Sequence, residues 1–350
     1  MTPYFVVLIL SLLCISAYQK KKRAIYIVLC ALPMILLIGF RSNMVGTDTA
    51  GYCRMFLSMK DYLNLENPWQ YFSTEKGFIA LNLILIQIAE KYWVFLTAVG
   101  AIGICCTLRS LSKLSEAWAL SLFIYITLGY YLFGFAAIRQ YIAMSIYMLA
   151  LPYLLNSNLK KYAIVVCIAA LFHQTVLIAL PLYFFVRLPF NKKTLSLVVI
   201  GGMLVGALIP HIMAFAATVE DRYAVYTEYS GGGSMFTIFY TIIAIFFIFQ
   251  RTKMQEEYLK RYDVYLNMII FGSLIYIVVT FSGLYGEVTR FAAYFQLATV
   301  FIWADLYKYR KSKLSPVFWG IVVAVHLVYF YVYLDKIGHI TPFVLNSALD

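Results

Sequence analysis

Arg139 is the residue whose surroundings most need a chemical explanation. It lies in "FGFAAIRQYIAMSIYM", residues 133–148, where Gln140 follows it and no acidic residue stands three or four positions away. A guanidinium inside an apolar helix must find an anion elsewhere, because burying an isolated charge is costly. That anion is either a carboxylate of the protein or the phosphate of a ligand.

His173 raises a similar question, because it interrupts a run, residues 162–186, that contains no Asp, Glu, Lys or Arg. Gln174 and Thr175 follow it, so imidazole, amide and hydroxyl groups cluster at one point. A neutral histidine can take a proton from a hydroxyl group near pH 7. The alternative is a structural histidine, bonded to backbone groups that a turn of the chain leaves without partners.

The stretch "GFRSNMVGTDTAGYCRMF", residues 39–56, carries a third candidate pair. Arg41 comes directly after an apolar run, and Asp48 lies in the turn-forming segment "GTDT". Their alternative roles are an interfacial arginine and the N-cap of a helix, respectively.

A fourth stretch, "LYGEVTRFAAYFQ" at residues 284–296, places Glu287 three residues before Arg290. That spacing permits an ion pair on one face of a helix. Tyr294, together with Tyr285 and Phe291, could instead form an edge that stacks against a sugar.

The elements that must position these groups are membrane helices. Hydrophobic residues make up 63% of the chain and charged residues 13%, whereas soluble proteins are nearer one half and one quarter. Apolar runs of about 20 residues, enough for one transmembrane helix, recur along the whole length. The composition predicts an all-α polytopic membrane protein with one membrane-embedded domain, residues 1–350, and excludes a soluble enzyme.

The net charge of +12 does not indicate nucleic-acid binding, because the cations stand in short clusters between the apolar runs. Positive-inside anchoring accounts for such clusters. The first apolar run is predicted to be a retained helix, since four cations, Lys20–Arg23, follow it and none precedes it. The six cysteines have no spacing typical of a metal site.

If the basic clusters lie in the cytoplasm, the chain between any two of them must cross the membrane an even number of times. Lys160, Lys161 and Arg187 then share one side, so a single continuous helix between them would invert everything that follows. We therefore predict two short or re-entrant helices that turn near His173 on the external side. By the same reasoning, residues 77–89 form a short helix before a crossing at 92–108.

The other expected helices bring the total to about 10–12, each long enough to enter or cross the bilayer. They cover residues 3–18, 24–40, 117–134, 136–155, 195–217, 235–250, 264–283, 290–306 and 315–334. External loops are expected at 41–76 and 218–234. This orientation puts Arg41, Arg139, Arg290 and His173 on the external side. Guanidinium groups there suit a pyrophosphate, because each can bind two of its oxygens.

The order of several motifs resembles the EpsG family, which is similar to the Wzy-type polymerases of bacterial O-antigen and capsule repeat units. The motifs are "FRSNMVGTDTAGYCRMF", "STEKGFIAL", "AAIRQYIAMSI", "LKKYAIVVCIAALFHQTVLIALPLYF", "EVTRFAAYF" and "ITPF". The last motif departs slightly from the Pro-Tyr often found in the family, because Phe343 follows Pro342 here.

The resemblance implies a GT-C-like bundle in the bacterial inner membrane that polymerises repeat units on undecaprenyl pyrophosphate at the periplasmic face. The expected glycosyl transfer is inverting and uses neither a metal nor another cofactor, and a chain-length regulator is an expected partner. Arg139 and Arg41 would hold the departing pyrophosphate, His173 would act as the base or position the acceptor, and Arg290 would contact phosphate or sugar. The remaining candidates for substrate contact are Asp48, Gln140, Gln174, Glu287 and Tyr294.

Two other functions stay open on the sequence alone. A flippase or transporter of lipid-linked oligosaccharides would also line a cavity with arginines, but it needs access from both sides in turn. A membrane acyltransferase could use His173, although its acyl-CoA site would face the cytoplasm, which the predicted orientation disfavours.

Overall fold

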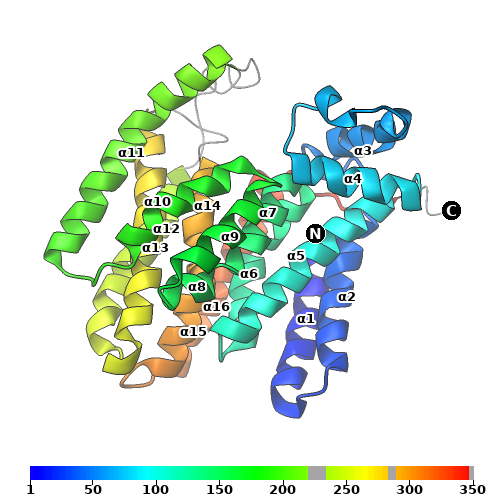
Figure 1. Ribbon diagram of the computed structural model, residues 1–350. Helices are drawn as coiled ribbons and strands as arrows, with labels where there is room; N and C mark the ends of the chain where they lie inside the picture. Colours follow the sequence, from blue (N-terminus) through cyan, green and yellow to red (C-terminus); the bar gives the residue numbers. More distant parts are fainter. Residues whose placement is uncertain (220–233, 283–288, 347–350) are drawn as a thin grey trace. The chain divides into compact units, whose positions relative to one another are not determined.

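The computed structural model describes residues 1–219, 234–282 and 289–346, and in this part of the chain every regular element is a helix (Figure 1). Two isolated β-bridges occur there, and no strand forms among the described residues. The predicted all-α class is therefore confirmed.

Several helices are long and apolar enough to cross a bilayer. Among the described residues these are Thr2–Lys21, Tyr92–Leu114, Ser234–Lys253, Glu256–Phe281 and Pro316–Ile337. Shorter apolar helices cover Ile25–Gly39, Lys76–Ile88, Trp118–Thr127 and Gln174–Val186. The chain is thus a multi-pass membrane protein that contains both long and shorter apolar helices.

The described chain divides into two compact units. The first contains Met1–Pro152, Lys160–Leu177 and Leu314–Asp350, and the second contains Tyr153–Leu159 and Ile178–Lys313.

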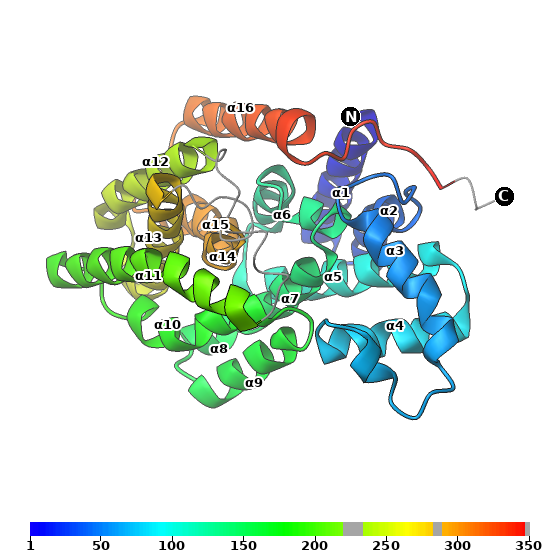
Figure 2. The same cartoon turned by 90° about the horizontal axis from the view of Figure 1, so that it is seen from above.

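The first unit is built around a hairpin of its first two helices, on which the other helices pack. Its helices are α1 (Thr2–Lys21), α2 (Ile25–Gly39), α3 (Thr49–Ser58), α4 (Lys76–Ile88), α5 (Tyr92–Leu114), α6 (Trp118–Thr127), α7 (Ile138–Met148), α9 (Leu159–Ala170) and α16 (Pro316–Val332). α1 and α2 pack against each other, α2 packs on α5, and α5 packs on α7. α3 lies beside α4 at one end of this group, and the α1–α2 connection lies at the other end (Figures 1 and 2).

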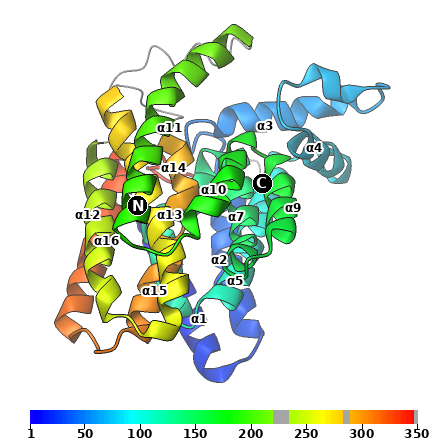
Figure 3. The same ribbon diagram turned by 60° about the vertical axis from the view of Figure 1, so that its left-hand side comes forward.

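The second unit is centred on α13 (Leu259–Ser282). Around it are α10 (Ala179–Val186), α11 (Lys192–Val219), α12 (Ser234–Gln250), α14 (Thr289–Gln296) and α15 (Thr299–Tyr309). α12 and α13 run side by side and are joined at one end (Figure 3). At that end, Asp263 accepts hydrogen bonds from Nε and Nη2 of Arg251 at 2.6 and 2.9 Å. Such a bidentate pair fixes the connection more firmly than a single contact.

Three predicted spans are wrong as continuous helices. Residues 117–134 form α6 and then a separate 3-10 turn, Tyr131–Phe135, after Gly129 with a φ of 84°. Residues 136–155 divide into α7 and the short helix α8 (Leu151–Leu155), and residues 290–306 divide into α14 and α15. Apolar composition predicts burial but does not require helical continuity, and breaks are tolerated where the backbone is buried in protein.

The run around His173 also breaks, and here the break was predicted. α9 ends at Ala170, a 3-10 turn covers Gln174–Ile178, and α10 begins at Ala179. With 12 residues, α9 is roughly 18 Å long, too short to cross a hydrocarbon core of about 30 Å. The short helices are therefore confirmed, whereas the side of the membrane on which they meet stays a prediction.

Gly46 provides a direct test of the loop that leads into α3. Its φ is 95°, and a Cβ at this position would lie 1.8 Å from the carbonyl oxygen of Phe135. Gly46→Ala should lower the unfolding free energy by about 1–3 kcal/mol, the cost of strained backbone, before any clash is added. The measurement is thermal unfolding in detergent.

Gly51 is the matched control for this prediction. It lies inside α3, and a Cβ there would meet no atom within 4 Å. Gly51→Ala should be neutral or stabilising by about 0.5–1 kcal/mol. Equal losses in the two variants would contradict the loop geometry.

Candidate functional site

Glu75 joins the two strongest candidates from the sequence, although the sequence did not single it out. Its Oε2 accepts a hydrogen bond from Nη1 of Arg139 at 2.6 Å, and its Oε1 lies 3.2 Å from Nδ1 of His173. The anion that Arg139 requires is thus a carboxylate of the protein. His173 is bonded to a charged side chain rather than only to backbone freed by a turn.

Helix ends explain why the carboxylate and the guanidinium meet here. Glu75 is the residue directly before α4, where the helix dipole favours a negative charge. Arg139 is the second residue of α7, where the same dipole disfavours a cation. The ion pair with Glu75 therefore compensates for the unfavourable interaction of Arg139 with the dipole of α7.

Gly77 allows α4 to approach the segment that carries His173. The backbone N–H of Phe78 donates to the carbonyl oxygen of Leu171 at 3.2 Å, and a Cβ on Gly77 would lie 2.7 Å from that same oxygen. The first turn of α4 therefore rests on the chain just before His173. Only a residue without a side chain permits this approach at its present distance.

Three more groups complete the network. The backbone N–H of Gln174 donates to Oε1 of Glu75 at 3.2 Å, and Oγ1 of Thr74 donates to Oε2 at 3.0 Å. Nε of Arg139 donates to the hydroxyl of Tyr52 at 3.2 Å. The carboxylate is thus held by groups from the loop before α4, the start of α7 and the segment after α9.

Burial is graded across the site. The side chain of Glu75 is 7% exposed, that of His173 14% and that of Arg139 25%. Among the described residues, neither Nε2 of His173 nor Nη2 of Arg139 makes a hydrogen bond. The carboxylate is therefore covered, while its two partners each keep one nitrogen available to a ligand.

The electrostatics assign different roles to the two titratable groups. Burial alone would raise the pKa of Glu75, but the hydrogen bond from His173 and the charge of Arg139 outweigh it and hold that pKa well below its usual range. Glu75 is therefore an ionised hydrogen-bond acceptor near neutral pH. Its contact favours the proton on Nδ1 of His173, which leaves a lone pair on Nε2.

Arg41 lies in the interior of the first unit. It is completely buried, and its Nη1 and Nη2 donate to the carbonyl oxygens of Ile38 at 2.6 Å and Gly134 at 2.9 Å, respectively. Its guanidinium also lies over the ring of Phe135, 4.8 Å from the centroid. Burial lowers the pKa of Arg41 to about 10, so it stays charged. Because Arg41 has no exposed donor, its phosphate-binding role remains a prediction without support from this geometry.

The remaining predicted residues are placed as follows. Asp48 directly precedes α3 and makes no side-chain cap hydrogen bond, Gln140 is 1% exposed on α7, and Gln174 joins the network through its backbone. Arg290 and the buried Tyr294 belong to α14 of the second unit, and Glu287 lies outside the described residues. Their contacts with substrate stay predictions.

A signal for Glu75 was present in the sequence. It is the acidic residue of "STEKGFIAL", directly before a short apolar helix, while Arg139 lacked a local partner. An acid at a helix start and a buried cation without an anion form a pair worth testing. Spacing could not reveal it, because 64 residues separate the two.

Acid should weaken this network in a defined window. Because the folded pKa of Glu75 is depressed, its stabilising contribution is fully present above its unfolded value of about 4.3 and is lost as the pH falls toward the folded value. Wild-type stability should therefore drop more steeply below pH 4.3 than that of Glu75→Gln, measured by thermal unfolding in detergent.

The matched control for this pH experiment is Glu90→Gln. Glu90 forms an exposed ion pair with Lys60, with side chains 61% and 51% exposed, and such pairs contribute little. It should keep the wild-type slope. If Glu75→Gln also kept that slope, the carboxylate would not be held as described.

Comparisons with known proteins assign the chain at the level of the family. The model of the EpsG family matches residues 24–345, nearly the whole chain, which includes every residue of the Glu75 network. Comparisons with curated proteins and with solved structures gave no match. The family is associated with polysaccharide polymerases, which indicates a membrane protein of polysaccharide biosynthesis. The chain therefore belongs to the EpsG family.

Proposed function

We propose that the protein is a repeat-unit polymerase, a membrane glycosyltransferase that lengthens a bacterial surface polysaccharide. The donor is a growing glycan on undecaprenyl pyrophosphate, and the acceptor is the terminal sugar hydroxyl of a lipid-linked repeat unit. The observation that carries the proposal is the Glu75 carboxylate, which bridges Nδ1 of His173 and Nη1 of Arg139. One carboxylate thereby orients a proton acceptor and a cation side by side.

His173 is the general base of this proposal. Glu75 is a weak base because its pKa is depressed, whereas a histidine with Nδ1 bonded to a carboxylate presents Nε2 to a hydroxyl group. The carboxylate also stabilises the imidazolium that forms when Nε2 takes the proton, as the acid does in a catalytic triad. This arrangement supports His173, rather than Glu75, as the group that accepts the proton.

Arg139 would stabilise the leaving group. As the acceptor oxygen bonds to the anomeric carbon, its proton passes to Nε2 of His173. The bond from that carbon to the pyrophosphate oxygen breaks, and the electron pair leaves with the lipid pyrophosphate. A preorganised guanidinium next to the departing oxygens lowers the energy of that transition state. Attack opposite the leaving group inverts the anomeric centre.

The two ends of α5 support an external location for this site. Phe95, in the first turn of α5, contacts the ring of Phe78, which contacts Tyr52, the hydrogen-bond partner of Arg139. Arg109 and Lys113 lie at the other end of this 23-residue helix, roughly 35 Å long. If that basic end is cytoplasmic, by the positive-inside rule, the Glu75 network faces the periplasm.

Aromatic side chains before Glu75 offer a surface for the glycan. The ring of Tyr62 lies 5.1 Å from that of Tyr71 and 5.0 Å from that of Phe72, centroid to centroid. Trp69 and Tyr71 are 40% and 53% exposed. Flat aromatic faces pack against the apolar faces of sugar rings, so this loop would guide the chain toward His173. A chain-length regulator remains a proposed partner.

Substitutions in the network test the catalytic roles. His173→Gln and Arg139→Ala should abolish long-chain glycan in cells, since loss of a general base costs about 10²–10⁴-fold in rate. Glu75→Gln should have a smaller but clear defect, because a neutral amide cannot stabilise the imidazolium. The readouts are the glycan ladder on gels and the amount of each variant in the membrane.

Glu90→Gln, in the exposed ion pair with Lys60, serves as the matched control and should leave the ladder unchanged. A normal glycan ladder in His173→Gln would rule out His173 as the general base. Single repeat units trapped on the cytoplasmic side, rather than exposed on the outer side, would identify a flippase instead of a polymerase.

A further inference from the structure

A groove in the first unit, of about 530 Å³, lies far along α5 from the Glu75 network. Its walls are apolar and include Val28, Leu32 and Ile35 of α2 and Cys105 and Leu108 of α5. Val28 and Leu32 are 55% and 45% exposed, so the groove is open along its length. Its size falls within the range of about 300–1,000 Å³ that small-molecule sites occupy.

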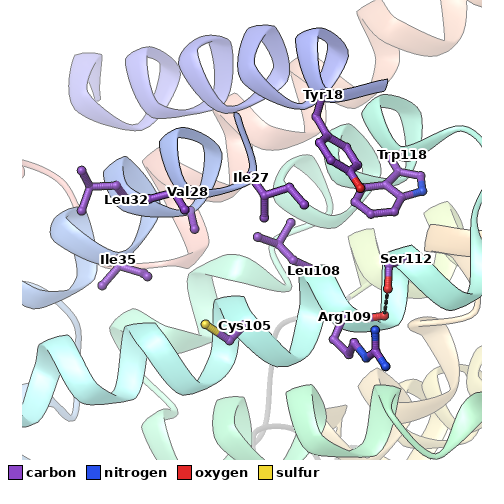
Figure 4. A pocket seen from close by; sticks show the side chains of 11 residues that line it. Tyr18, Ile27, Val28, Leu32, Ile35, Cys105, Leu108, Arg109, Ser112 and Trp118 are labelled. Atoms are coloured by element: carbon purple, nitrogen blue, oxygen red, sulfur yellow. Dashed lines mark hydrogen bonds between the residues drawn. The ribbon is translucent and has the colours of Figure 1, made fainter. Parts of the chain in front are cut away.

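One end of the groove, here called its mouth, is polar, unlike the apolar walls. Tyr18, Trp118, Ser112 and Arg109 gather at one end, whereas Leu32 and Ile35 lie at the other (Figure 4). Tyrosine, tryptophan and arginine are the side chains that favour the level of lipid headgroups. The groove therefore has an apolar part and a polar, cationic end, as an amphiphilic ligand requires.

The charge around the mouth selects an anion. Lys20 and Lys21 end α1, Lys22 and Arg23 follow them, and Arg109 and Lys113 lie in the last turns of α5. The segments 20–23 and 109–118 hold these six cations and one acidic residue, Glu116. Clusters of this kind attract anionic lipids from the adjacent leaflet.

We propose that the groove binds one anionic phospholipid, with an acyl chain along α2 and α5 and its phosphate on the guanidinium of Arg109. The lipid comes from the leaflet at the basic end of α5, opposite the end of that helix from which Phe95 leads to the Glu75 network. It is thus separate from the lipid-linked substrates and holds α1, α2, α5 and α6 together. The inference does not depend on the proposed polymerase activity.

Native mass spectrometry of the purified full-length protein tests the proposal. The protein is exposed to equal amounts of phosphatidylglycerol and phosphatidylcholine with the same acyl chains. Wild type should retain one phosphatidylglycerol in preference to phosphatidylcholine. Arg109→Gln should reduce that preference about fivefold, the contribution of one cation near an anionic headgroup.

Filling the groove should remove the lipid altogether. Leu32→Trp places an indole between α2 and α5 and should lower the number of retained lipids by one. Ala31→Phe, from the same wall, gives a second obstruction if the first variant fails to fold. Alkylation of Cys105, an exposed thiol that lines the groove, should be slowed by phosphatidylglycerol in wild type and not in these variants.

Two controls match the substitutions in chemistry and exposure. Lys91→Gln removes a cation directly before α5, at the opposite end of that helix, and Val328→Trp adds an indole to α16, where Val328 is 64% exposed. Both should bind lipid as wild type does. Equal retention of the two lipids by wild type, an unchanged lipid number in both obstructed variants, or the same loss in Lys91→Gln would overturn the proposal.

Discussion

One buried carboxylate holds together the candidate functional site of this protein. Glu75 is 8% exposed and accepts from Arg139, His173, Thr74 and the backbone of Gln174. Removing one partner of such a pair leaves an uncompensated charge, at a cost of about 3–5 kcal/mol. The start of α7, the loop before α4 and the segment after α9 are therefore constrained jointly. Gly77 permits the approach that this constraint requires.

Arg139 and Arg41 show two solutions to the same problem, a guanidinium in an apolar environment. Arg139 pairs with a carboxylate and keeps a quarter of its side chain exposed, so it can still meet a ligand. Arg41 is enclosed by carbonyl oxygens and the ring of Phe135, and it secures the end of α2. The first arrangement suits binding and catalysis, whereas the second suits the fold. The same residue type thus has different partners at a helix start and after a helix end.

In the first unit, the two proposed sites lie toward opposite ends of α5. At one end of α5, a buried anion organises a histidine and an arginine. At the other end, Arg109 lines an apolar groove, and the segments 20–23 and 109–118 hold five further cations and one acidic residue. A helix of roughly 35 Å keeps these ends apart, so the proposed catalytic site and the proposed lipid groove are separate.

The sequence by itself determined the membrane class, most helix positions and the break near His173, because apolar length and charge parity are local or additive properties. It also identified Arg139 as a cation that needs a distant anion. Only the tertiary structure decided that this anion is Glu75, because residues 64 apart meet through the packing of helix ends. It likewise decided that Arg41 is enclosed and that the spans at 117–134, 136–155 and 290–306 are broken. Hydrophobicity predicts which residues leave water, but contacts between distant segments decide which polar groups they meet and where a helix must stop.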